Sequence, residues 1–207
     1  MAIASQAATG PDVLELDGLT IRAGTGGQAT TPVRDLSLCV AAPTVRAQQP
    51  PADPISASLR SEWNSAKANV RKSADVMPEA KYNFKPVDTV RTFGAILAHL
   101  AGASYEFCSA ARGEKTPHAE DEFEKSATTK AAIVKSLDGA IAYCDEAFKT
   151  ADDAKLAQIV NGAFGGGKVP RAAMLSGNTG HYMEHYGNIL TYLRINGLVP
   201  PSSAPQQ

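Results

Sequence analysis

The chain has 207 residues, a formal net charge of −1 and 6% aromatic residues. This length suits one domain, or one domain with an appendage, and suffices to bury a sizeable core. The near-neutral charge gives no electrostatic reason to expect nucleic acid as a partner. Because no apolar run approaches the ~18 residues of a membrane-spanning helix, we expect no membrane partner either.

Residues 1–52 differ in character from the rest and form a leader. Residues 13–21 (VLELDGLTI) alternate as a strand does, and residues 35–42 (DLSLCVAA) are a second possible strand. This piece, read as VLELDGLTIRAG and then TPVRDLSLCV, resembles the opening strands of an ABC-transporter ATPase domain. No G-x-x-x-x-G-K-[ST] phosphate loop occurs in the sequence, so we infer no nucleotide binding.

Other interpretations of the leader stay open. Val45-Arg46-Ala47 fits the small-residue rule of signal-peptide cleavage, but it lies too far from Met1 for an ordinary signal. A disordered leader is the favoured interpretation, and a fused or mis-started fragment is the alternative. A proline-rich run (QQPPAD) follows, so we place the domain at residues 53–203 and a tail at residues 204–207.

From residue 53 onward, four segments carry apolar residues at every third or fourth position, as amphipathic helices do. End signals agree with this, since Pro54 suits a first helical position and Gly197 a C-terminal cap. The four segments predict an all-α four-helix bundle, whose core can host a metal site. They cover about residues 54–77, 88–111, 126–150 and 171–197.

The connections between these helices differ in composition. Residues 112–125 (RGEKTPHAEDEFEK) read as an exposed, charged link, in which His118 is interpreted as solvated rather than as a ligand. A short helix is predicted at residues 153–160. The glycine-rich residues 161–168 (NGAFGGGK) form either a flexible connector or a lip over a site.

Two histidines stand one turn apart on the last predicted helix. His181 and His185 share a face with apolar residues, and two imidazoles at this spacing can hold one divalent metal ion. The alternative is a pair of buried, hydrogen-bonded histidines. The order H-x-x-E-H, with Glu184, also occurs in inverted zinc proteases, but Glu184 points away from the histidines.

His99, at the border of the apolar stripe of the second helix, is within reach of this pair in a bundle. Three neutral imidazoles on one side of a metal ion leave positions open for water or substrate, as catalytic sites do. Asn178 lies one turn before His181, and it either orients a ligand, contacts substrate or is a polar core residue. Tyr182 and Tyr186 either flank the pocket or form a dimer seam.

The segments that carry these histidines, TVRTFGAILAHLAGA and GHYMEHYGNILTYLRINGLVPPSS, resemble the DinB-like family of metal-dependent four-helix-bundle proteins. The resemblance extends from about Pro54 to Ser203. It implies that His99, His181 and His185 are the metal ligands, with nickel or zinc as the metal. It also implies an up-down-down-up bundle and a homodimer. Relatives include thiol-dependent transferases and a maleylpyruvate isomerase.

In an up-down-down-up bundle the second and third helices are parallel, which brings Cys108 and Cys144 to the same end. They are either a disulfide or two small buried residues. Without an ordinary signal peptide the expected compartment is the cytoplasm, whereas a disulfide would indicate a periplasmic or secreted protein.

The sequence thus predicts a metalloenzyme that acts on a small molecule, by hydrolysis or by thiol-dependent transfer. The alternative is a non-catalytic, metal-binding stress or partner-binding bundle. A solvent-connected cavity at the three histidines would favour the enzyme.

Overall fold

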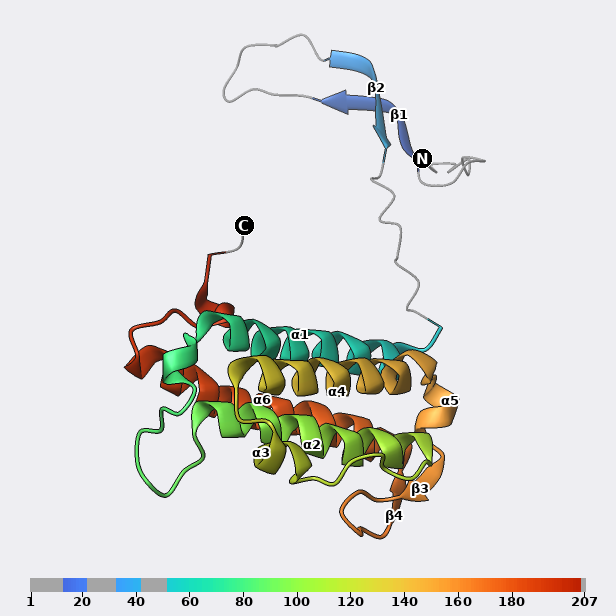
Figure 1. The fold of residues 1–207 in the computed structure, drawn as a ribbon. Coiled ribbons are helices and arrows are strands. Elements are labelled where there is room, and N and C mark those ends of the chain that lie inside the picture. The colour runs from blue at the N-terminus through green and yellow to red at the C-terminus, as the bar shows by residue number, and fades with distance from the viewer. Residues whose placement is uncertain (1–12, 22–32, 42–51, 206–207) are drawn as a thin grey trace. The chain divides into compact units, whose positions relative to one another are not determined.

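The computed structural model describes residues 13–21, 33–41 and 52–205, and the chain divides into two units, residues 1–49 and 50–207 (Figure 1). In the first unit β1 (Val13–Ile21) pairs with β2 (Val33–Ala41) in an antiparallel hairpin. The predicted strand at 13–21 is confirmed, and the second begins two residues earlier than predicted. The sequence Val45-Arg46-Ala47 lies outside the described residues.

The second unit is a bundle of four long helices, which lie side by side in Figure 1, as predicted. The long helices are α1 (Pro54–Val76), α2 (Phe93–Arg112), α4 (Lys130–Thr150) and α6 (Arg171–Ile195). The shorter elements are α3 (Glu122–Ser126), α5 (Asp153–Leu156), the strands β3 (Ile159–Asn161) and β4 (Lys168–Pro170), and 3-10 turns at Glu79–Lys81 and Pro201–Ser203.

Contacts at the helix ends fix the directions of the four helices. The α1 residue Arg60 donates to the carbonyl of Ala151, just after α4 ends (2.8 Å), so α1 and α4 are antiparallel. Tyr192, near the end of α6, donates to the carbonyl of Arg91, just before α2 begins (3.0 Å), so these two are also antiparallel. The starts of α2 and α4 lie together, as do the two cysteines near their ends. The bundle is therefore up-down-down-up.

Capping side chains set the helix starts and shift two of the predicted boundaries. Thr92 accepts a hydrogen bond from the Ala95 N–H (3.1 Å), so α2 begins at residue 93 rather than 88. Thr129 does the same for α4, which begins at residue 130 rather than 126. At the other end of α6, Gly197 has φ +72° and Leu198 N–H donates to the Leu193 carbonyl, the predicted glycine cap.

The link predicted at 112–125 is exposed or partly exposed throughout, and most of α3 lies within it. One prediction about the connections is wrong. The helix predicted at 153–160 ends at Leu156, and residues 159–161 instead pair with residues 168–170 as a small hairpin. The glycine-rich residues form the turn of that hairpin, where Gly165 has φ +72°.

The core is centred on Trp63, whose ring stacks on Phe148 of α4 and meets Tyr182 of α6 edge-on (centroids 5.0 and 4.8 Å). Its indole N–H donates to Asp145 (2.6 Å), so one side chain joins three helices. A disulfide between Cys108 and Cys144 (Cα–Cα 5.3 Å), the predicted pair, joins α2 to α4.

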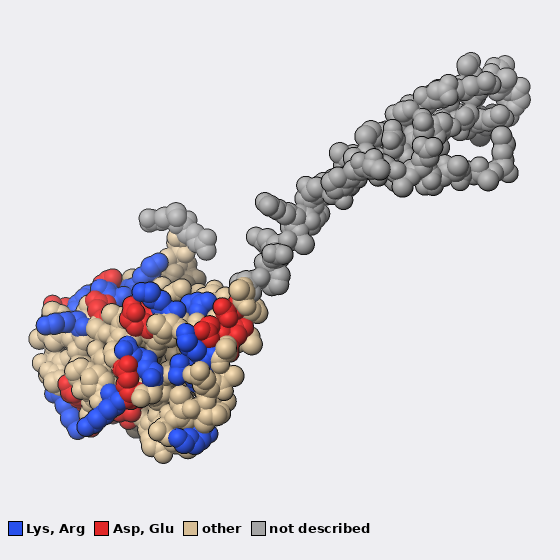
Figure 2. All heavy atoms as spheres, turned by 90° about the vertical axis from the view of Figure 1, so that its right-hand side faces the viewer, with Lys and Arg blue, Asp and Glu red and all other residues tan. Residues whose placement is uncertain are grey.

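The surface carries charges of both signs. On the face in Figure 2, blue and red side chains lie intermixed, in keeping with the net charge of −1. Among the described helices, none combines the length and apolar character needed to cross a membrane.

Candidate metal centre

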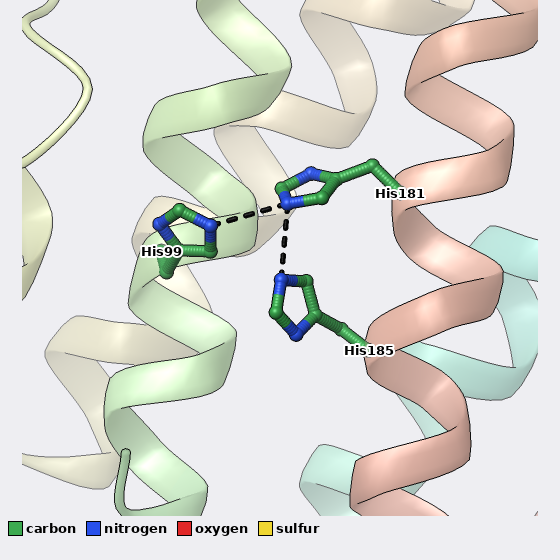
Figure 3. Close-up of side chains that lie close together, drawn as sticks. All are labelled: His99, His181 and His185. Carbon is green, nitrogen blue, oxygen red and sulfur yellow. Dashed lines mark hydrogen bonds between the residues drawn. The ribbon is translucent and has the colours of Figure 1, made fainter. Parts of the chain in front are cut away.

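Three histidines from two antiparallel helices converge between α2 and α6 (Figure 3). His181 Nε2 lies 3.1 Å from His99 Nε2 and 3.0 Å from His185 Nε2. One ligand nitrogen from each ring lies within 4.8 Å of the others. The helical spacing of His181 and His185 aims both rings at α2, and His99 meets them from the opposite side. The structure thus brings together the three predicted ligands.

The donor set fits a divalent cation. A neutral imidazole offers one N–H and one lone pair, yet His181 Nε2 faces two other nitrogens and cannot pair fully with both. A cation can accept all three lone pairs at once. With metal–nitrogen bonds of about 2.05 Å, tetrahedral ligands lie about 3.3 Å apart and octahedral neighbours about 2.9 Å apart. The two short separations agree with either geometry.

Burial keeps two of these rings neutral. It is the largest cause that lowers the pKa of His181 to about 3, and the neighbouring His185 and His99 lower it further. Burial also lowers the pKa of His185, with His99 as the next cause. Both rings are only partly buried, whereas His99 is 6% exposed. At neutral pH the lone pairs of His181 and His185 are therefore available.

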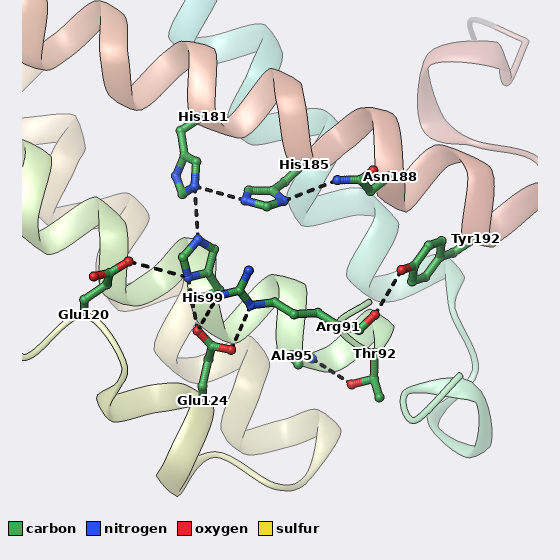
Figure 4. A network of polar contacts seen from close by, with 10 residues as sticks. All are labelled: Arg91, Thr92, Ala95, His99, Glu120, Glu124, His181, His185, Asn188 and Tyr192. Carbon is green, nitrogen blue, oxygen red and sulfur yellow. Dashed lines mark hydrogen bonds and ion pairs between the residues drawn. The ribbon is translucent and has the colours of Figure 1, made fainter. Parts of the chain in front are cut away.

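The ion pair between Glu124 and Arg91 lies at the Nδ1 side of the His99 ring (Figure 4). His99 Nδ1 lies 3.1 Å from Glu124 Oε1 of α3 and 3.9 Å from Glu120 Oε1. Arg91 donates through Nε to the other Glu124 oxygen at 2.9 Å. A carboxylate that accepts the Nδ1–H leaves the Nε2 lone pair free to bind a metal.

The supporting residues could not be identified in the sequence. Glu124 lies among seven other acidic and basic side chains of a link that reads as solvated, and only the fold of α3 selects it. Asn188, which places its amide 3.5 Å from His185 Nδ1, has no signal beyond its helical spacing from that ring.

An aromatic pair borders His181. The Phe107 ring lies 5.9 Å from the His181 ring, and Phe164 of the β3–β4 turn packs edge-on against Phe107 at 5.0 Å. Gly177 leaves room for this, since a Cβ there would lie 3.0 Å from Phe107. A cavity of about 370 Å³ between α2 and the hairpin is lined by Phe164 and Lys168 among others, and its lining does not include the histidines.

The structure places two other predicted site residues, Tyr182 and Tyr186, in the core. Tyr182 is fully buried, with its hydroxyl beside Ser104 Oγ (3.1 Å). Tyr186 is 6% exposed and its hydroxyl donates to Ser202 (2.7 Å). These tyrosines were predicted to flank a pocket or form a dimer seam, whereas both side chains are buried here, because one residue's offset on a helix turns a side chain by about 100° away from the histidines.

Asn178 and His118 lie apart from the three rings. Asn178 is fully buried, with Nδ2 3.6 Å from Cys144 Sγ, which agrees with the polar-core interpretation. His118 lies outside the cluster, as predicted, but is not freely solvated. It hydrogen-bonds Glu122 (2.9 Å) and packs on Tyr105 (4.5 Å).

Comparison with known proteins places this bundle in a family. The sequence model of the DinB superfamily matches residues 62–189, and these include all three histidines. The chain belongs to the DinB superfamily. No curated protein matches this DinB-superfamily chain.

Solved structures share its fold. A DinB-like protein from Bacillus cereus has a TM-score of 0.56 and 18% identity, over 70% of this chain and 95% of that one. A member of the DinB family from Exiguobacterium sibiricum gives 0.53 and 18%, over 69% and 92%. The mycothiol-dependent maleylpyruvate isomerase gives 0.54 and 18%, over 65% of this chain and 60% of the isomerase. At these identities the likeness concerns the fold alone.

Proposed function

We propose that this DinB-superfamily chain is a metalloenzyme that binds a divalent metal ion through His99, His181 and His185. It acts on a small molecule as a hydrolase or as a thiol-dependent transferase. The observation that carries the proposal is the convergence of three Nε2 atoms, with separations of 3.0 and 3.1 Å at His181. Neutral imidazole donors suit nickel or zinc, and we propose one of these as the metal.

The chain's own residues have distinct roles in this proposal. The three imidazoles bind from one side, Glu124 orients His99, and Phe107 excludes water from the His181 edge of the site. A divalent ion bound there supplies Lewis-acid chemistry, lowering the pKa of a water molecule or of a thiol.

A thiol is the favoured small-molecule partner. The isomerase that shares this fold is mycothiol-dependent by name, which supports a low-molecular-weight thiol as a substrate or co-substrate here. The alternative, a non-catalytic metal-binding bundle, requires a metal ion sealed from solvent. The partial exposure of His181 and His185 favours the enzyme.

Cobalt substitution distinguishes the metalloenzyme from the non-catalytic metal-binding bundle. The metal-stripped protein is loaded with Co²⁺ and titrated with a small thiol while its absorption spectrum is recorded. An open coordination position predicts a new thiolate-to-cobalt charge-transfer band, which His181→Ala abolishes. An unchanged spectrum, in a protein that does bind Co²⁺, would contradict the enzyme proposal and favour the sealed bundle.

Two further proposals concern assembly and location. We propose a homodimer, following the family resemblance, and light scattering during size-exclusion chromatography tests it. The Cys108–Cys144 disulfide supports an oxidising compartment, periplasmic or secreted. Thiol titration in denaturant, with and without reductant, tests the bond, and equal counts would remove this support.

A further inference from the structure

The link between α2 and α3 crosses directly over Gly102. A Cβ on Gly102 would overlap the Glu120 carbonyl group, lying 2.7 Å from its carbon atom. A contact this short with backbone cannot be relieved by rotating a side chain. Gly102 has an ordinary helical backbone, so its lack of a side chain serves the close approach and not an unusual φ. The link can lie this close to α2 only because residue 102 is glycine.

Gly102 stands three residues after His99, on the same side of α2. The link that it admits therefore passes beside the His99 ring, where Glu120 Oε1 lies 3.9 Å from Nδ1. Four residues later, on α3, Glu124 approaches the same nitrogen to 3.1 Å. Arg91, just before α2, holds Glu124 from its other side, and the Glu124 side chain is 23% exposed.

His99 depends on this support more than the other two rings do. His181 and His185 project from one helix at a spacing that aims both at the same point. His99 comes alone from α2, and its ring orientation is set by the contact at Nδ1 (Figure 4).

We propose that Glu124 is a positioning residue for the metal centre and that Gly102 is the residue that lets it reach His99. Glu124 accepts the Nδ1–H of His99 and so turns the Nε2 lone pair toward His181 and His185. Gly102 contacts none of these atoms, yet it fixes the path of the link that carries Glu124. The inference rests on the proposed metal binding.

The test compares Zn²⁺ affinity, measured by calorimetric titration of the metal-stripped protein, across matched variants. Gly102→Ala and Glu124→Gln are each expected to weaken Zn²⁺ binding by about 10- to 100-fold. The double variant should have the same Zn²⁺ affinity as the single variant that binds Zn²⁺ less tightly, because both changes break the same contact.

Two controls match these changes. Gly187→Ala is also a helical Gly→Ala change, but its Cβ meets open space. Glu122→Gln removes a carboxylate from the same short helix, one that bonds His118 instead of His99. Both should bind Zn²⁺ as the parent protein does.

A second readout follows the ring itself. In ¹⁵N spectra of the metal-free protein, His99 is expected to carry its proton on Nδ1, and Gly102→Ala should shift it toward a mixture of tautomers. A structural role for Gly102 elsewhere in the bundle would leave this signature unchanged.

The outcomes separate the two proposals. Absence of Zn²⁺ binding by the parent protein would defeat the proposed function itself. Tight binding by the parent and by both folded variants would overturn only the positioning role. If Gly102→Ala does not fold, Glu124→Gln, at a partly exposed site, still decides the role of Glu124. If Gly102→Ala folds and binds Zn²⁺ with the affinity of the parent protein, the role proposed for Gly102 is overturned.

Discussion

Helix α2 packs against α4 on one side and α6 on the other, and the two contacts are built differently. Toward α4 it uses the Cys108–Cys144 disulfide and a hydrogen bond between Ser109 and Tyr143 (3.0 Å). Toward α6 it places His99 against two other imidazoles, whose nitrogens cannot all be paired. The α4 contact is made by a covalent bond and a hydrogen bond, whereas the α6 contact brings three imidazole rings together. We interpret the first as holding the fold and the second as the functional site.

Removing the disulfide should produce the largest loss of stability. The bond spans 36 residues, so its chain-entropy contribution is about 4 kcal/mol. The double variant Cys108→Ala/Cys144→Ala should show this loss in urea denaturation, yet bind Zn²⁺ at the parent stoichiometry wherever it is folded. If Zn²⁺ binding vanished in the folded variant, the two sides of α2 would not be separable.

Acid should destabilise the metal-free protein through His181, on the α6 side of α2. The folded pKa of His181, about 3, lies below its ordinary value of 6.5, so between these values the unfolded chain binds a proton that the folded chain does not. Stability of the metal-free protein is therefore full above pH 6.5 and falls as the pH drops toward 3.

Urea midpoints at about pH 7 and about pH 4.5 measure this slope. His181→Ala should flatten it, and the cysteine double variant should keep it. An equal slope in His181→Ala and the parent would show that the acid sensitivity arises elsewhere.

A smaller effect distinguishes two neighbouring residues of α6. Tyr182 follows His181 directly but belongs to the core, where its hydroxyl lies beside Ser104. Tyr182→Phe should cost about 1 kcal/mol of unfolding free energy and leave Zn²⁺ affinity unchanged. Denaturation and calorimetry on the same sample check both, and weakened Zn²⁺ binding would place Tyr182 in the site after all.

The difference between the two sides of α2 also explains what the sequence could predict. His181, His185 and the four long helices follow from helical spacing, which is a local property. The partnership of His99 with them, and of Cys108 with Cys144, required the bundle topology as well. Glu124 required the path of the link between α2 and α3, where Glu120 lies against Gly102, and this path leaves no periodic pattern.

The tyrosines show the limit of spacing arguments. Tyr182 and Tyr186 have the same four-residue separation as the histidines, and whether such a pair is core or site depends on which neighbouring helix it meets. The β3–β4 hairpin was missed because its strands are three residues each, too short for alternation to be recognised.

Metal content per chain, measured on purified protein by elemental analysis, tests the central claim most directly. The account predicts stoichiometric nickel or zinc in the parent protein and in His118→Ala, whose ring lies outside the cluster. It predicts loss of that metal in His99→Ala, the variant that removes the ligand contributed by α2. Stoichiometric metal retained in His99→Ala would contradict a site built between α2 and α6.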